Sequence, residues 1–182
     1  AAQEEPGSGQ TSMSTGGEPP EAFVVAENIE DSGNSGLAVS AYKSFIKNFP
    51  TSPFASTAQF RIANILSSQG NPSKAFDAYQ TLLTTYPDTP NFDAAVAQQV
   101  LIANAYLQGK RMVFMGMPIV PGTERAQKMY ESILNSAPYS KHAPIAQFNL
   151  GLSLERQKMI AEARQAYQKV LDRYPNSDVC DD

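Results

Sequence analysis

The stretch AFDAYQTLLTTYP, residues 75–87, contains the residue pattern from which the fold can be predicted. Ala75 and Tyr79 are four residues apart and therefore lie on one face of a helix. Pro87 ends that helix, because its nitrogen cannot donate a hydrogen bond and its ring clashes with the preceding turn. The twelve residues from Ala75 to Pro87 correspond to about three helical turns. The segment is thus predicted to be one short helix with a defined end.

The same spacing of Ala, Tyr and Pro occurs four times along the chain. The other copies are Ala38, Tyr42 and Pro50; Ala126, Tyr130 and Pro138; and Ala163, Tyr167 and Pro175. Another helical segment precedes each copy along the chain and carries one small residue. In chain order these small residues are Ala26, Ala63, Ala103 and Gly151. Small residues on both helices let two antiparallel helices approach closely, and Gly33, Gly70 and Gly109 follow as helix stops.

These repeats predict an all-α fold of four tandem helical hairpins. The spacing of the small residue, the Ala and aromatic pair and the Pro matches the tetratricopeptide pattern, so we expect a short right-handed α-solenoid. The predicted repeat domain spans residues 20–178, with repeats at about residues 20–52, 53–89, 90–140 and 141–177. Residues 1–19 are rich in Gly, Ser, Glu and Pro and are predicted to form a disordered acidic tether.

The third repeat is longer than the others and contains an apolar insertion. Residues 110–122 read KRMVFMGMPIVPG. One interpretation is a long loop that packs its apolar side chains onto neighbouring helices, and the other is a docking element for a partner protein. In the second interpretation the flexible methionine side chains adapt their contacts to the surface of the partner protein. The docking candidates are Met112, Phe114, Met115 and Met117.

Composition argues against several classes of function. The chain has 14 Lys and Arg against 18 Asp and Glu, a net charge of −4 that does not favour general binding to nucleic acid. It has one His and one Cys, and no P-loop, dinucleotide-binding or zinc motif. We therefore expect no enzyme, no cofactor and no metal site. His142 is expected to face solvent, and Cys180 to be an inert thiol near a frayed end.

The first helix of each hairpin is expected to line a concave groove that binds a partner protein. The candidate groove residues are Phe23, Glu27, Phe60, Asn64, Ser67, Val100, Asn104 and Leu107. An alternative for the Phe residues is packing between repeats. Asn64 and Asn104 are the strongest candidates, because an Asn at equivalent sites of adjacent repeats can both donate to and accept from the backbone of an extended peptide. At the other end, Tyr167 and Val170 are expected to be partly uncovered.

The repeats resemble those of the tetratricopeptide lipoproteins of the bacterial envelope, in particular the BamD family of outer-membrane assembly lipoproteins. The links between hairpins carry this resemblance, and they read FPTS at residues 49–52, YPDT at 86–89 and YPNS at 174–177. TPNFD at residues 89–93 resembles the H-P-N-[IV]-D stretch that opens the third repeat of that family. The family also carries a long insertion in that repeat, and the resemblance covers about residues 18–178.

The resemblance implies a scaffold on the periplasmic face of the outer membrane. Its partners would be outer-membrane β-barrel proteins and subunits of the assembly machinery, and a lipid on an N-terminal Cys upstream of residue 1 would anchor it. The family has five repeats where four are found here, which affects the expected docking surface. Two alternatives stay open. They are a periplasmic Tol-Pal-associated cell-division coordinator, which usually lacks the insertion, and a general tetratricopeptide adaptor.

Overall fold

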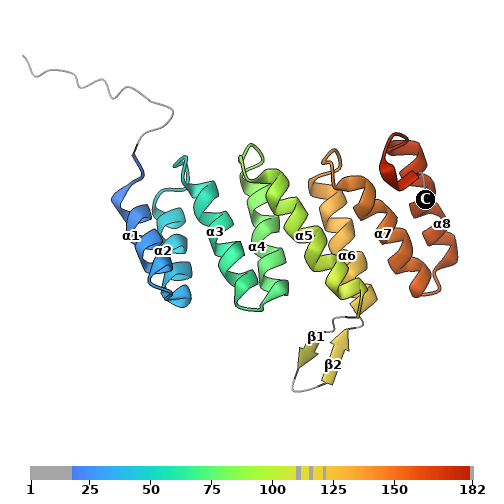
Figure 1. Ribbon diagram of the computed structural model, residues 1–182, viewed down its shortest axis with the longest axis horizontal. Helices are drawn as coiled ribbons and strands as arrows, with labels where there is room; N and C mark the ends of the chain where they lie inside the picture. Colours follow the sequence, from blue (N-terminus) through green and yellow to red (C-terminus); the bar gives the residue numbers. More distant parts are fainter. Residues whose placement is uncertain (1–17, 110–111, 115–116, 121, 181–182) are drawn as a thin grey trace, which may run out of the picture.

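The computed structural model describes residues 18–109, 112–114, 117–120 and 122–180. Within these ranges there are eight α-helices and one β-hairpin (Figure 1). The helices are α1 (Glu21–Asp31), α2 (Ser35–Asn48), α3 (Ala55–Ser68), α4 (Pro72–Thr85), α5 (Phe92–Leu107), α6 (Gly122–Ser136), α7 (Ala143–Arg156) and α8 (Ile160–Arg173). The strands are β1 (Met112–Phe114) and β2 (Met117–Val120), and a 3-10 turn, η1 (Asp178–Cys180), follows α8. None of the described helices combines the length and apolar character needed to cross a membrane.

The helices pair in sequence order into four hairpins that stand side by side in a row (Figure 1). Each hairpin packs against the next, so the core runs along the row. This arrangement confirms the predicted all-α solenoid. The antiparallel hairpin of β1 and β2, which lies between α5 and α6, is an addition that helical periodicity did not predict.

Residues with left-handed backbone end the first helix of every hairpin. Gly33, Gly70 and Gly109 have φ values of 82°, 73° and 114°, which confirms their predicted role as helix stops. In the fourth hairpin the corresponding residue is Lys158, with φ of 63°. Because a side chain disfavours this conformation, the fourth hairpin contains local backbone strain that the first three avoid.

Small residues allow the close approach of the two helices in each hairpin. The paired small residues Ala26 and Ala38, Ala63 and Ala75, and Ala103 and Ala126 are all fully buried. In the fourth hairpin Gly151 lies against the ring of Tyr167, and a Cβ atom at Gly151 would be only 2.5 Å from Cε1 of that ring. The glycine is therefore required by contact with the tyrosine rather than by backbone conformation.

Glutamines four residues before the small residue tie the helices together. Gln59 and Gln147 each donate to a backbone carbonyl of the second helix in their own hairpin, at 2.9 and 3.0 Å. Gln99 instead reaches the preceding hairpin and donates to Oε1 of Gln80 at 2.9 Å. Our sequence analysis followed apolar and small residues and missed this repeated Gln, although its constant spacing from the small residue was visible.

The last hairpin is better covered than predicted. Val170 is buried, so the expectation that it would be partly uncovered is wrong. The 3-10 turn η1 folds back onto α7 and α8. Tyr167 is half-buried, and Ile160 and Leu171 on α8 are exposed.

Candidate functional site

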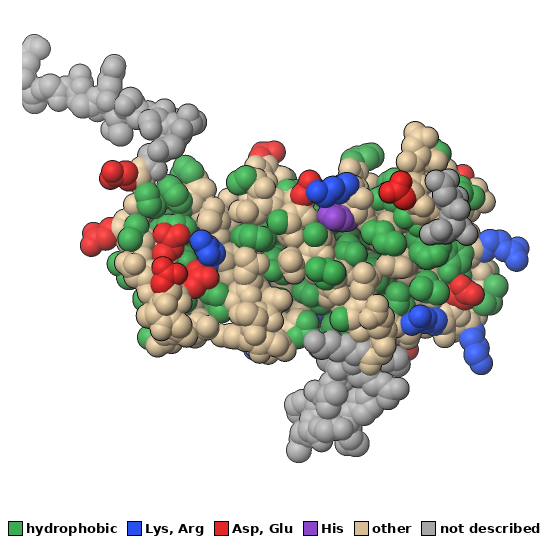
Figure 2. Space-filling view, in the orientation of Figure 1, with side chains coloured by type: hydrophobic (Ala, Val, Ile, Leu, Met, Phe, Trp, Pro, Cys, Tyr) green, Lys and Arg blue, Asp and Glu red, His purple; other side chains and the backbone are tan. Residues whose placement is uncertain are grey.

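The predicted groove residues belong to the first helices of the first three hairpins, α1, α3 and α5. The side of the row formed by all four first helices, α1, α3, α5 and α7, is defined as the front face. Acidic side chains gather over α1, and hydrophobic side chains are more prominent over α5 and α7 (Figure 2). Acidic side chains are therefore concentrated at the N-terminal end of the front face.

Two asparagines of the front face are held by tyrosines from the second helices. The hydroxyl of Tyr79 donates to Oδ1 of Asn64 at 2.6 Å, and that of Tyr130 donates to Oδ1 of Asn104 at 2.6 Å. Asn149 of the next hairpin donates its Nδ2 to the same Oδ1 of Asn104 at 3.0 Å. The amides of Asn64 and Asn104 are thereby fixed in orientation, with their oxygens engaged inside the protein.

This arrangement corrects the expected role of the two asparagines. We predicted that Asn64 and Asn104 would offer both a donor and an acceptor to a peptide, but Oδ1 of Asn104 already accepts two hydrogen bonds and Oδ1 of Asn64 accepts one. Their Nδ2 groups have no hydrogen-bond partner among the described residues, and both side chains are half-buried. What they offer to a ligand is a pair of oriented N–H donors.

The tyrosines of the outer hairpins bind glutamates instead. Tyr42 donates to Glu30 at 2.6 Å and Tyr167 donates to Glu155 at 2.7 Å. Burial, and then the bond to Glu30, raises the pKa of Tyr42, and burial followed by the bond to Glu155 raises the pKa of Tyr167 to about 12. Sequence reasoning missed these bonds, although both pairs have the same separation of twelve residues.

Burial also raises the pKa of the tyrosines in the inner hairpins. It raises the pKa of Tyr79 to about 12. The pKa of Tyr130 is raised by burial, while the neighbouring Asn149 amide and the charge of Arg156 oppose the rise. Each hairpin therefore joins its two helices through a phenol that stays neutral at physiological pH.

A charged cluster marks the N-terminal part of the front face. Arg61 of α3 lies 3.9 Å from Glu27 and 3.7 Å from Glu30, both on α1. The Arg61 and Glu27 side chains are well exposed, so each pair contributes at most about 1 kcal/mol. Glu27, a predicted groove residue, is thus at the surface and already paired.

Three predicted groove residues are not at the surface. Phe23, Val100 and Leu107 are buried, so the prediction that they line an open groove is wrong. The Phe23 ring packs on Phe45 of its own hairpin, with ring centroids 5.4 Å apart, and on Phe54 at the start of the next repeat, at 5.1 Å. The contact with Phe54 is the packing between repeats that was the alternative. Large apolar side chains facing a neighbouring helix gain more from burial than from exposure in a groove.

Two other candidates keep part of their surface exposed. Phe60 is half-buried and packs on Tyr79, with ring centroids 5.9 Å apart. Ser67 is also half-buried. Both side chains therefore keep surface that a ligand can contact. Phe60 is also continuous with the buried core, because it packs on Tyr79.

Leu101 is an exposed apolar residue that the sequence analysis missed. Its side chain is 59% exposed, although it lies in the middle of the row. It precedes Asn104 by three residues and so lies beside it on α5. The equivalent residues two positions before the small residue are Val24, Arg61 and Asn149, so the sequence gives no uniform signal that this position faces solvent.

The apolar insertion lies partly outside the described residues. Met115 belongs to the undescribed part, and for Met112, Phe114 and Met117 only the backbone, in β1 and β2, is described. Neither interpretation of the insertion is therefore decided by side-chain contacts. The end of α5, from which the insertion departs, is held by Arg156 of α7, whose guanidinium donates to the carbonyl of Leu107.

The single His and the single Cys belong to other segments, the start of α7 and the turn η1. His142 was expected to face solvent but is half-buried at the start of α7, and its Nε2 is enclosed without a partner among the described residues. Burial lowers the pKa of His142, the neighbouring Lys141 lowers it further, and Asp93 opposes the shift. Cys180 ends η1, and its side chain lies outside the described residues.

Comparison with known families identifies the repeats. Tetratricopeptide repeat models match residues 30–90 and residues 145–177. These segments contain α2 to α4 and most of the fourth hairpin. No protein with curated annotation matches the chain significantly.

Several solved structures are similar to the chain. A tetratricopeptide repeat protein from Parabacteroides merdae ATCC 43184 is 18% identical, over 87% of this chain and 54% of that one, with a TM-score of 0.47. Two structures of MamA are 16% and 17% identical over 83% of this chain and 70% and 75% of theirs, each with a TM-score of 0.43. The chain spans about half the length of the first of these proteins.

Proposed function

We propose that this chain, a row of tetratricopeptide repeats, is a non-enzymatic scaffold that binds an extended segment of a partner protein across its front face. Repeat arrays of this kind present long surfaces built from equivalent positions of successive repeats, and tetratricopeptide domains mediate interactions between proteins. An extended peptide matches such a surface, because its backbone groups also recur at regular intervals.

The observation that carries the proposal is the orientation of the Asn64 and Asn104 amides. Because a tyrosine holds each oxygen, each Nδ2 is preset to donate outward, and little conformational entropy is lost when it meets a carbonyl or carboxylate. Leu101 adds an apolar contact beside Asn104. The surface is therefore suited to a peptide that offers backbone acceptors and apolar side chains.

The resemblance to the BamD family suggests a more specific proposal. The bound segments are strands of outer-membrane β-barrel proteins before they fold, and the site of action is the periplasmic face of the outer membrane, beside other subunits of the assembly machinery. An unfolded strand has unpaired backbone carbonyls and alternating apolar side chains, which fits the donors and Leu101. The general adaptor is the alternative that fits the repeats equally well.

Titration with peptides tests the proposal. A fluorescein-labelled C-terminal peptide of an outer-membrane β-barrel protein is expected to bind with a saturable rise in anisotropy, and a peptide of scrambled sequence is expected to bind more weakly. Equal binding of the two would favour the general adaptor. Saturable binding of neither would contradict the use of the front face for extended peptides.

Asn→Asp variants test the role of the amides. Asn64→Asp and Asn104→Asp keep an oxygen for the tyrosine but replace the outward donor with a repelling carboxylate, so together they are expected to weaken binding roughly tenfold. Asn48→Asp and Asn71→Asp make the same change in charge at exposed positions off the front face. An equal effect of both pairs would remove the two amides from the proposed site.

A further inference from the structure

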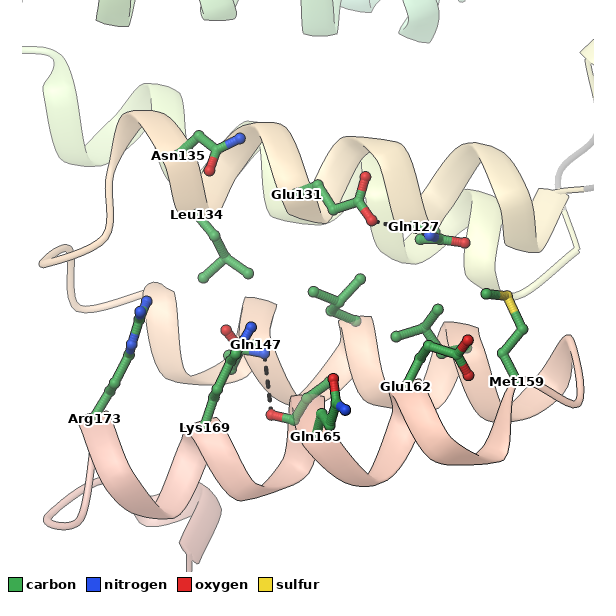
Figure 3. Close-up of a pocket in the computed structure, with 13 residues that line it drawn as sticks. Gln127, Glu131, Leu134, Asn135, Gln147, Met159, Glu162, Gln165, Lys169 and Arg173 are labelled. Atoms are coloured by element: carbon green, nitrogen blue, oxygen red, sulfur yellow. Dashed lines mark hydrogen bonds between the residues drawn. The ribbon is translucent and has the colours of Figure 1, made fainter.

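A second surface lies between the second helices of the last two hairpins. A groove of about 420 Å³ runs along α6 and α8 and has α7 as its floor (Figure 3). Leu134, Leu150 and Leu154 contribute the apolar lining. Among the described residues no hydrogen bond or ion pair joins α6 to α8. In contrast, α4 and α6 are linked by Arg125, which donates to Ser73 at 2.8 Å and lies 3.9 Å from Asp77.

Comparison with the interface between the second and third hairpins shows that this groove exposes positions that are buried there. Leu83 and Ile102, which face each other between the second and third hairpins, are only 3% and 6% exposed. Their equivalents, Leu134 and Leu150, are half-buried and line the groove. The interface between the last two hairpins is therefore less completely closed on this side, and it leaves apolar surface that a ligand can cover.

The charges on the groove are separated along its length. Glu131 and Glu162 lie toward the end marked by Met159, whereas Lys169 and Arg173 lie toward the opposite end (Figure 3). From residue 159 to residue 173 the groove follows about four turns of helix, or roughly 20 Å. A ligand that fits this groove has an apolar stripe of similar length and opposite charges at its two ends.

We propose that the groove binds an amphipathic α-helix of a partner protein, with acidic residues in its N-terminal half and basic residues in its C-terminal half. The acidic half lies beside Lys169 and Arg173 and the basic half beside Glu131 and Glu162, so the bound helix runs antiparallel to α6 and α8. This surface is separate from the front face, so the inference does not depend on the proposed function.

The order of charges in the ligand follows from helix electrostatics. Acidic residues near the N-terminus and basic residues near the C-terminus stabilise a helix through its macrodipole. A peptide with this order is therefore more helical when free, and it loses less entropy on binding. Its apolar stripe then covers Leu134 and Leu150.

A designed peptide provides a direct probe. It has 18 residues, leucines at helical spacing, glutamates in the first two turns, lysines in the last two, and a fluorescein label. It is expected to bind the full chain saturably. Lys169→Glu with Arg173→Glu should weaken binding about tenfold, because two attractive contacts become repulsive. A second peptide with lysine in place of every glutamate should instead bind this variant about tenfold more tightly than the unmodified chain.

Lys128→Glu with Arg164→Glu is the matched control, because these exposed residues lie on the same two helices outside the groove and the change in net charge is identical. It should leave both affinities within about twofold, and circular dichroism should show equal helicity for all variants.

Absence of saturable binding by the designed peptide, or equal effects of the two variant pairs, overturns the proposal. Self-association of the unmodified chain that is lost in Lys169→Glu with Arg173→Glu also overturns it, since a second copy is then the ligand.

Discussion

The hydroxyl of Tyr79 lies 2.6 Å from Oδ1 of Asn64, and this bond connects the buried core of the second hairpin to the front face. Tyr79 is almost completely buried, whereas Asn64 keeps part of its surface. The same relationship links Tyr130 to Asn104 in the third hairpin. The residues that stabilise the hairpins therefore also set the orientation of the proposed binding groups.

Removal of this hydroxyl is expected to affect stability and binding together. Tyr79→Phe keeps the ring but loses the bond, so the free energy of unfolding should fall by about 1 kcal/mol, measured by urea denaturation. Peptide affinity should also fall, because the Asn64 amide becomes free to rotate. Tyr139→Phe is the control, since Tyr139 is 97% exposed and should change neither quantity. If Tyr79→Phe lowered the stability but left the peptide affinity unchanged, the Tyr79 hydroxyl would stabilise the hairpin without orienting Asn64 for binding.

Gly151→Ala is expected to destabilise the fourth hairpin. The new methyl group would come within 2.5 Å of Cε1 of Tyr167, so the ring must move and its contact with Phe148 weakens. We expect a loss of about 1–3 kcal/mol in the free energy of unfolding. Gly36→Ala is the matched control, because that Cβ meets nothing within 4 Å, and it should be neutral or slightly stabilising. Equal stability of the two variants would contradict the close contact.

Lys158→Gly is expected to stabilise the chain. Lys158 has φ of 63° at the position where the first two hairpins have Gly33 and Gly70. Relief of this strain should raise the free energy of unfolding by roughly 1 kcal/mol. The reverse change, Gly70→Lys, should lower it by a similar amount. Thermal or urea unfolding of the two variants measures both effects, and shifts of the same sign would show that the backbone conformation is not their cause.

Stability is expected to fall at alkaline pH. Burial raises the pKa of Tyr79 from 10.0 to about 12, so the folded state holds this proton more tightly than the unfolded state. The resulting stabilisation is fully present below about pH 10 and is lost as the pH rises through about 12. Urea midpoints measured between pH 8 and 12 should therefore decline above pH 10. The decline should be smaller in Tyr79→Phe, and an identical decline would assign the effect to other groups.

The spacing of residues determined the fold of this chain. Ala and Tyr four residues apart, followed by Pro, recur four times, and each element follows from local physical constraints on helices and their ends. The left-handed glycines could be predicted for the same reason, since a helix stop depends on one residue's backbone conformation. The hairpin of β1 and β2 was not predicted, because helical periodicity contains no information about an irregular insertion.

Which residues of the first helices are available to a ligand depends on the packing between hairpins. Periodicity places Phe23, Val100 and Asn64 on comparable sides of their helices, but it does not show how a neighbouring repeat covers that side. Packing buries Phe23 and Val100, because apolar surface gains free energy when water is excluded, and it leaves Asn64 half-exposed with its oxygen bound to Tyr79. The groove between α6 and α8 has the same origin, since equivalent apolar residues are buried or half-buried according to how closely adjacent hairpins pack.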